Sequence, residues 1–484
     1  MENKKLAITR TKINLWSILL TLELAFLIFR CFRPIGGLDS FRQAQTVWPV
    51  KIWNIEGFSP LQPSVPIKGI EHQNWLLELP IYQWIIYSIN VFIGIDPVYI
   101  SRILSLLCAL FIVNFLANQI SNKTTVDKRI LMILMITNPY MFYWMTTGLV
   151  DWLSIVLGIV CGILATANRR KSFLILSIVT GVLGSGIKPS HSLFGFLIVI
   201  SLKLSTISKK RLISVLIIIP SLMFFVSTSW QNWVSKKYPL DDPRSIWSLN
   251  SSTFTWYFGT LDQYIHIGNN LSFILERLIP SFGGIALVTL CLIGYLNTDF
   301  DWKPKLLLIL IPLMYTAVLI NLNISHYYYQ IPLAIVLSLI VGSGLIFWHE
   351  QNFMKKVRKE YIFSILIVLC FSYTSTGNNM SYIKSMLVNE PVKTECLSGS
   401  KIANSTVLLV NWESPAFFYD CGIKSFQVNL NKNTDANAFS KEKDDYKYVY
   451  IDSNIGIVSK FIKDLNGELK KVSETDHWYE ITWK

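Results

Sequence analysis

The sequence contains little charge. Charged residues make up 15% of its 484 residues, whereas soluble proteins carry about 25%. Hydrophobic residues reach 52% and aromatic residues 13%. This composition excludes a disordered chain, a collagen-like chain and a disulfide-dense secreted module, and it argues against a soluble enzyme. The many long apolar stretches instead predict a polytopic α-helical membrane protein.

Strong metal-binding patterns are absent as well. The sequence contains no C-x-x-C and no H-E-x-x-H, so no structural zinc site or zincin-type site is indicated. Five of the seven cysteines lie in or beside apolar stretches, where we expect them to pack as small hydrophobic residues. The other two, Cys396 and Cys421, lie in the polar tail. They form a disulfide if that compartment is oxidising and remain free thiols otherwise.

The net charge of +13 is unevenly distributed. Residues 377–484 contain 13 lysines, no arginine and 14 acidic residues, which gives −1, so the first 376 residues carry +14. Positively charged cytoplasmic loops explain an excess in the membrane part of a chain. A nucleic-acid partner is not expected, because no basic cluster lies on a soluble segment.

The apolar stretches and the basic loops together predict a topology. Basic loops and the N-terminus are expected on the cytoplasmic side. The first crossing leads out of the cytoplasm, and the next basic loop is expected back inside, so the chain has to cross an odd number of times between them. However, two apolar stretches, 79–95 and 99–120, lie there. The stretch 79–95 is short and aromatic, so we expect it to lie in the outer interface as a juxtamembrane helix, which leaves about eleven crossings. The apolar stretches are 13–30, 79–95, 99–120, 129–147, 150–167, 173–188, 191–207, 212–230, 280–298, 306–322, 331–348 and 361–376.

The chain divides into two parts under this topology. Residues 1–376 form the transmembrane part, with long outer loops at 31–98 and 231–279, and residues 377–484 form a tail on the outer side. The tail has a different character, which predicts a small α/β domain. Its strand-like segments are 406–411, 424–429, 446–452 and 477–483, and its helical candidates are 414–420 and 454–465.

The first outer loop contains the first candidate for chemistry. Asp39 follows two glycines at the end of the first crossing, where a carboxylate could take a proton from a hydroxyl nucleophile. Arg42 stands three residues later and would share a helical face with Asp39. The alternative is that Asp39 caps a helix over 40–54.

Two further acids begin predicted helices on the same side. Glu78 precedes the juxtamembrane helix, with Pro80 close to the first turn, and Asp151 lies in the next outer loop. Both have a simple alternative, because an acid at a helix N-terminus is favourable without any catalytic role.

The remaining candidates are a lysine and a histidine–tyrosine segment. Lys188 ends a crossing on the outer side, where its charge could neutralise a lipid phosphate; the alternative is snorkelling to the interface. His326 and Tyr328, in the segment SHYYYQIP, could supply hydrogen-bond donors and flat faces to a phosphate or a sugar. An aromatic belt explains the tyrosines but not the histidine.

Convergence on one side of the membrane strengthens these individually weak signals. Charge placement alone puts Asp39, Glu78, Asp151, Lys188 and His326 on the outer face, in five different loops. No ATP or nucleotide sugar is available there, so a group donor has to arrive already activated, commonly on a lipid phosphate.

These motifs resemble a known family. The chain is similar to the GT-C superfamily of polytopic glycosyltransferases, in the branch of the protein O-mannosyltransferases and the aminoarabinose transferases of lipid A. The resemblance extends over roughly the whole length, including the tail after the last crossing. The motifs that carry it are LDSFRQAQT, LLELPIYQW, GLVDWLS, GIKPS and HYYYQIP.

The resemblance implies an inverting transfer from a polyprenyl-phosphate sugar to an acceptor hydroxyl, with Asp39 as the base. Lys188, Arg42 and His326 would stabilise the lipid phosphate. The mannosyltransferases have a second acid directly after the first, where this sequence has Ser40. This difference argues against a protein acceptor.

The resemblance implies less specific roles for the other candidate residues. Glu78 and Asp151 would position hydroxyl groups of the sugar or the acceptor, or a divalent metal if one is used. The expected partners are the lipid-linked donor, a glycan, lipid or protein acceptor and the bilayer itself. The expected location is a bacterial cytoplasmic membrane, with the tail outside, in a pathway of surface glycan or lipopolysaccharide modification.

Two alternatives remain open at this stage. An O-antigen ligase or polymerase also acts outside on lipid-linked sugars, but a large outer loop late in its chain usually dominates. A lipid-linked-sugar transporter predicts charged residues at mid-membrane depth and broken helices, and only Glu23 fits the first of these features.

Overall fold

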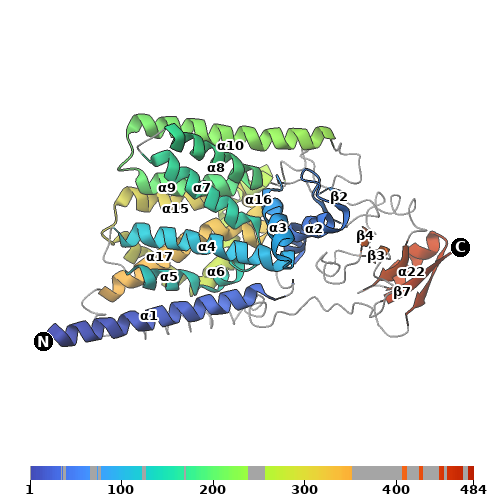
Figure 1. The fold of residues 1–484 in the computed structure, drawn as a ribbon, viewed down its shortest axis with the longest axis horizontal. Helices are drawn as coiled ribbons and strands as arrows, with labels where there is room; N and C mark the ends of the chain where they lie inside the picture. Colours follow the sequence, from blue (N-terminus) through green and yellow to red (C-terminus); the bar gives the residue numbers. More distant parts are fainter. Residues whose placement is uncertain are drawn as a thin grey trace. The chain divides into compact units, whose positions relative to one another are not determined.

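The computed structural model describes most of the membrane part and the strands of the tail (Figure 1). Asp39, Cys396 and Cys421 lie outside the described residues, as does the predicted crossing 361–376. The described residues are 2–33, 35, 40–65, 73–74, 78–122, 127–167, 171–237, 255, 257–350, 406–410, 424–428, 446–451, 455–472 and 478–484.

The chain forms two compact units. The first consists of Met1–Arg33, Tyr99–Trp230 and Leu249–Val388, and the second of Pro34–Val98, Gln231–Ser248 and Asn389–Lys484.

Helices dominate the first unit. Its N-terminal half, with the ends of two helices that run into the second unit, contains α1 (Glu2–Cys31), α4 (Pro97–Ser121), α5 (Lys128–Ile136), α6 (Pro139–Trp144), α7 (Val150–Thr166), α8 (Lys171–Ile187), α9 (Pro189–Lys203) and α10 (Lys209–Lys237). Its C-terminal half contains α12 (Leu261–Ile265), α13 (Ile267–Leu278), η1 (Ile279–Phe282), α14 (Ile285–Leu296), α15 (Trp302–Val318), α16 (Ile320–Ser325), η2 (Tyr327–Gln330) and α17 (Ile331–Glu350).

The helices have the length and composition of a membrane protein. Within the described residues, Pro97–Ser121, Lys209–Lys237 and Tyr327–Glu350 are each long and apolar enough to cross a bilayer. A bent pair, Ile267–Phe282 with Ile285–Leu296, makes a fourth if it is a single span. Large apolar side chains on α10, such as Phe224 (70% exposed), face outward, as expected of a surface in contact with lipid. The polytopic helical architecture is confirmed, while the number of eleven crossings stays a prediction.

Three predicted stretches are not single helices, and one of them, 306–322, is divided between α15 and α16. The stretch 129–147 is interrupted between α5 and α6, because Asn138 caps α6 through a 3.1 Å hydrogen bond from the Met141 amide and Pro139 occupies the first turn. The stretch 280–298 contains an 82° bend before α14. Gly283 and Gly284 make this bend with φ of +83° and +90°, a conformation that other residues rarely adopt.

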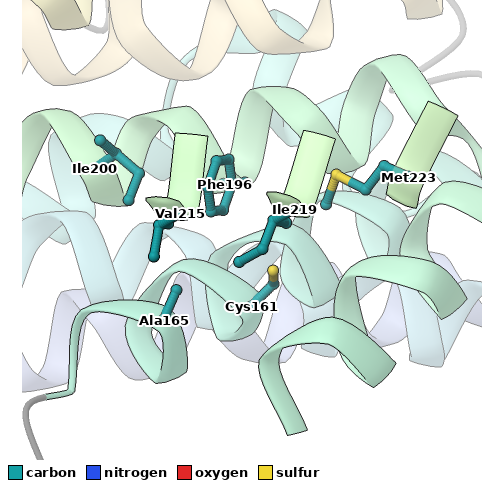
Figure 2. Close-up of a cluster of buried hydrophobic side chains, with 7 residues drawn as sticks. All are labelled: Cys161, Ala165, Phe196, Ile200, Val215, Ile219 and Met223. Atoms are coloured by element: carbon teal, nitrogen blue, oxygen red, sulfur yellow. The ribbon is translucent and has the colours of Figure 1, made fainter. Parts of the chain in front are cut away.

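Helices α7 and α9 pack closely against each other in the first unit. A Cβ atom on Gly158 of α7 would lie 2.0 Å from the Ser192 carbonyl oxygen, and one on Gly195 of α9 would lie 2.3 Å from the Ile155 carbonyl oxygen. The two backbones therefore touch, which only glycine permits. A hydrophobic cluster continues this packing onto α10 (Figure 2), with Cys161, Ala165, Phe196, Ile200, Val215, Ile219 and Met223.

Replacing Gly158 with alanine is expected to lower stability, since the new methyl group meets backbone that cannot rotate away. Overpacking of this kind typically costs about 1–3 kcal/mol. The thermal unfolding midpoint of the purified protein in detergent measures the effect. Gly268→Ala on α13 is the matched control, because nothing lies within 4 Å of its added Cβ. Equal midpoints for the two variants would contradict the contact between α7 and α9.

In the second unit, the segment Pro34–Val98 contains α2 (Ser40–Glu56), α3 (Ile81–Ile93) and a two-stranded ladder of β1 (Ser64–Val65) and β2 (Gln73–Asn74). The Trp53, Phe58 and Tyr87 rings pack together between α2 and α3, at centroid distances of 4.7 to 5.8 Å. The 13 residues of α3 rise about 20 Å, which is too short for a hydrocarbon core of about 30 Å. Its interfacial position, which this length favours, stays a prediction.

The tail forms one five-stranded sheet in the order β4-β3-β5-β7-β6. Strand β3 is parallel to β4 and β5, and β7 is antiparallel to both of its neighbours, β5 and β6. The four predicted strands and the helix predicted at 454–465 are confirmed, whereas β6 was not predicted because its sequence, GELKK, is mostly polar. The elements are β3 (Thr406–Val410), β4 (Lys424–Val428), β5 (Tyr446–Tyr450), α22 (Ile455–Asp464), β6 (Gly467–Lys471) and β7 (Trp478–Trp483).

Candidate functional site

A buried acid–base cluster lies where α7 and α9 begin. Lys188 Nζ lies 2.5 Å from Asp151 Oδ1, and His191 Nε2 lies 3.0 Å from the same oxygen. The three residues are 5%, 0% and 0% exposed, respectively. Ionised groups are rarely this buried unless they are paired, so the contact between Asp151 and Lys188 explains how both are retained.

The local sequence places Lys188 in this cluster. α8 ends at Ile187 and α9 begins at Pro189, so Lys188 stands between them in an extended conformation. Proline suits the first position of a helix because it lacks the amide hydrogen that would be unpaired there. Ser154 Oγ on α7 donates to the Lys188 carbonyl at 2.7 Å and to the Gly184 carbonyl at 3.0 Å. This hydroxyl joins the turn to the helix that carries Asp151.

Aromatic rings form a second boundary of the cluster. The Lys188 ammonium lies 3.7 Å from the centroid of the Tyr329 ring and 4.9 Å from that of Tyr328. Both rings belong to η2, which a 2.5 Å hydrogen bond from Tyr140 Oη to the Tyr327 carbonyl ties to α6. A cation over an aromatic face is stabilised most where it is desolvated. Lys188 is therefore buried and held by a carboxylate and two rings.

His326 lies at the edge of the same aromatic group. Its ring is 5.3 Å from that of Tyr328 and is half-buried. The predicted residues Asp151, Lys188, Tyr328 and His326 therefore come together in the first unit, linked through the tyrosine.

Arg277 joins this group and was not predicted from the sequence. Its Nη1 donates to the Ile324 carbonyl at 2.5 Å, and its guanidinium lies 3.8 Å from the Phe273 ring centroid and 4.9 Å from that of Tyr327. A basic residue within an amphipathic segment at the end of the loop 231–279 was the available signal. It supplies a second cation beside η2.

His191 was also missed. It stands three residues after Lys188 in the motif GIKPSHS, within the first turn of α9. The Tyr315 hydroxyl lies 3.2 Å from its Nδ1, and the two rings meet edge to face with centroids 5.4 Å apart. The spacing was visible in the sequence, but nothing there indicated that His191 would face Asp151.

The second unit pairs two other predicted residues with each other. Arg42 on α2 forms a salt bridge with Glu78, just before α3, and their side chains are only 8% and 14% exposed. The helix predicted over 40–54 is confirmed as α2, which begins at Ser40, directly after Asp39. Asp39 itself lies outside the described residues, so its predicted role is not tested.

Metal ligands do not cluster in the part of the chain that the structure describes. No group of three or more His, Cys, Asp or Glu side chains comes together there in a way that could hold a metal ion. The first unit does place an amine and a guanidinium beside tyrosine rings. Two cations beside aromatic rings can bind a ligand in which an anionic group is attached to a polar or apolar part.

No protein-family model and no curated protein matches the sequence. Solved structures with a similar fold do exist. One is ArnT from Cupriavidus metallidurans bound to undecaprenyl phosphate, with a TM-score of 0.59 and 10% identity over 96% of this chain and 97% of that one. Its apo state gives a TM-score of 0.52. The arabinofuranosyltransferase AftD from Mycobacteria gives 0.54 with 11% identity over 97% of this chain and 41% of that one. The chain therefore shares its fold with ArnT and with the matched part of AftD.

Proposed function

We propose that this protein is an inverting glycosyltransferase that moves a sugar from a polyprenyl-phosphate donor to an acceptor hydroxyl on the outer face of the membrane. The observation that carries the proposal is the buried ammonium of Lys188, held by Asp151 and two tyrosine rings. It occurs in a fold similar over nearly its whole length to that of ArnT bound to undecaprenyl phosphate. A surface glycan or lipopolysaccharide is the proposed acceptor class, because Ser40 replaces the second acid of the protein mannosyltransferases.

The donor phosphate is proposed to bind beside η2. As the bond between the sugar and the phosphate breaks, negative charge grows on the leaving lipid phosphate. Cations that are already in place and partly desolvated stabilise this charge more effectively than water does. Lys188 and Arg277 meet this requirement, because each is held over a tyrosine ring of η2. His326 and the tyrosine hydroxyl groups are proposed to contribute hydrogen bonds to the phosphate or the sugar.

The acceptor hydroxyl is proposed to lose its proton to Asp39. Attack on the anomeric carbon from the side opposite the phosphate inverts its configuration. Glu78, held by Arg42, offers a fixed carboxylate that can accept hydrogen bonds from sugar or acceptor hydroxyl groups. The ion pair with Glu78 also changes the proposed role of Arg42, from a phosphate ligand to the partner that orients this carboxylate.

Transfer assays with purified protein test the function. The protein in detergent is incubated with a panel of radiolabelled polyprenyl-phosphate sugars and candidate glycan acceptors, and the anomeric configuration of the product is determined by NMR. Transfer with inversion from at least one donor is expected. Failure with every polyprenyl-phosphate sugar, together with no measurable binding of undecaprenyl phosphate, would overturn the proposal.

Arg277→Gln is expected to weaken donor use, because it removes one of the two cations proposed for the phosphate. A charge-assisted hydrogen bond is worth about 1.5–3 kcal/mol, so kcat/KM for the donor should fall about 10- to 100-fold. Lys237→Gln is the matched control, since it also removes a cation placed over a ring, that of Trp233, but from an exposed position. Equal losses in both variants would indicate a general effect of charge and no phosphate contact at Arg277.

A further inference from the structure

His191 is a fully buried histidine that the proposed mechanism does not use. Its side chain is 0% exposed and lies between two polar partners on different helices. Nε2 is 3.0 Å from Asp151 Oδ1 on α7, and the Tyr315 hydroxyl on α15 lies 3.2 Å from Nδ1 and 3.4 Å from Nε2. Ser190 Oγ also lies 3.3 Å from Nδ1.

These contacts determine which ring nitrogen carries the proton. An ionised carboxylate only accepts hydrogen bonds, so Nε2 must be the donor to Asp151. Nδ1 can then accept from the Tyr315 hydroxyl, which gives a neutral imidazole with every polar atom paired. A doubly protonated ring would place a second cation beside Lys188 in a buried site, which is costly.

One oxygen of Asp151 therefore has two donors. Oδ1 accepts from the Lys188 ammonium at 2.5 Å and from His191 at 3.0 Å. The imidazole belongs to α9, which packs tightly against α7, so it limits rotation of the carboxylate about its Cβ–Cγ bond. The position of the ammonium over Tyr328 and Tyr329 depends on where this oxygen points.

We infer that His191 is a positioning residue, which as a neutral Nε2–H tautomer fixes the Asp151 carboxylate and thereby holds the Lys188 ammonium against the η2 tyrosines. It does not contact the donor phosphate itself. The part of this inference that concerns phosphate affinity rests on the proposed function, whereas the tautomer and the orientation of Asp151 do not.

The tautomer can be measured without any substrate. The chain has six histidines, so protein labelled with ¹⁵N-histidine gives few signals, and His191→Gln identifies the one that belongs to His191. We expect the nitrogen shifts of a neutral ring protonated at Nε2 at pH 7. A ring protonated at Nδ1, or at both nitrogens, would overturn the inference.

Two conservative variants test the positioning role. The amide nitrogen of glutamine reaches about the place of Nε2, whereas that of asparagine reaches about the place of Nδ1. His191→Gln therefore keeps the donor to Asp151 and His191→Asn loses it. We expect the Kd for undecaprenyl phosphate to change less than about threefold in the first variant and to rise about 10-fold or more in the second, as the loss of a hydrogen bond to a charged group predicts.

A matched control separates positioning from a general need for histidine. His266, directly after α12, pairs with Asp262 of that helix at 3.3 Å, but both side chains are exposed, so His266→Gln and His266→Asn should both leave the Kd unchanged. Equal Kd values for His191→Gln and His191→Asn would overturn the positioning role. If the wild-type protein binds no undecaprenyl phosphate, the proposed function fails, and the tautomer measurement alone then decides the assignment of His191.

Discussion

Asp39→Asn is expected to leave the chain folded and in the membrane while slowing sugar transfer about 10²–10⁴-fold, the usual contribution of a general base. Asparagine keeps the size and polarity of the side chain but cannot accept the proton of the acceptor hydroxyl. Initial rates of transfer under donor saturation measure the effect on kcat. Donor affinity should change little, because the cations proposed for the phosphate are on other residues.

An exposed acid provides the control for this substitution. Asp262 on α12 has a side chain that is 81% exposed, so Asp262→Asn should keep normal turnover. The unfolding midpoint of both variants should match that of the wild type. Normal turnover by Asp39→Asn would move the base to another residue, for which Glu78 would be the first to examine.

The sequence predicted those parts of the fold whose causes are local. Apolar stretches, basic loops and alternating β-branched residues each reflect a physical requirement that acts within a few residues. For this reason the helical membrane part and four strands of the tail could be predicted, whereas β6 could not. The strand β6 is held by pairing with β7, from Gly467 opposite Trp483 to Lys471 opposite Tyr479, and its own composition is polar.

The sequence indicated which residues belong to the candidate site, but not which of them pair with one another. Charge placement indicated that Asp151 and Lys188 lie on one side of the membrane, but it did not show that they form a buried ion pair. The same holds for Arg42 and Glu78, which are 36 positions apart and meet through the packing of α2 against α3. Contacts of this kind depend on tertiary packing, which no local pattern in the sequence encodes.

Replacing Lys188 alone is expected to destabilise the protein strongly, because it leaves the buried carboxylate of Asp151 without the cation that neutralises its charge. Breaking a buried ion pair by removing one partner costs about 3–5 kcal/mol, so the unfolding midpoint of Lys188→Met in detergent should fall well below that of the wild type. Asp151→Leu should fall as well, although Tyr329 and Tyr328 still lie against the lysine.

The double variant Asp151→Leu/Lys188→Met separates stability from function. Removing both charges avoids an unpaired buried ion, and exchanging a buried pair for apolar residues is often neutral or stabilising. The double variant should therefore unfold at a higher temperature than either single variant, yet transfer sugar about 10- to 100-fold more slowly than the wild type, because the phosphate has lost one of its two proposed cations. If the effects of the two substitutions on the midpoint were additive, Asp151 and Lys188 would not be coupled. If the double variant instead transferred sugar at the wild-type rate, the ion pair would serve stability alone, and Arg277 would remain as the cation for the phosphate.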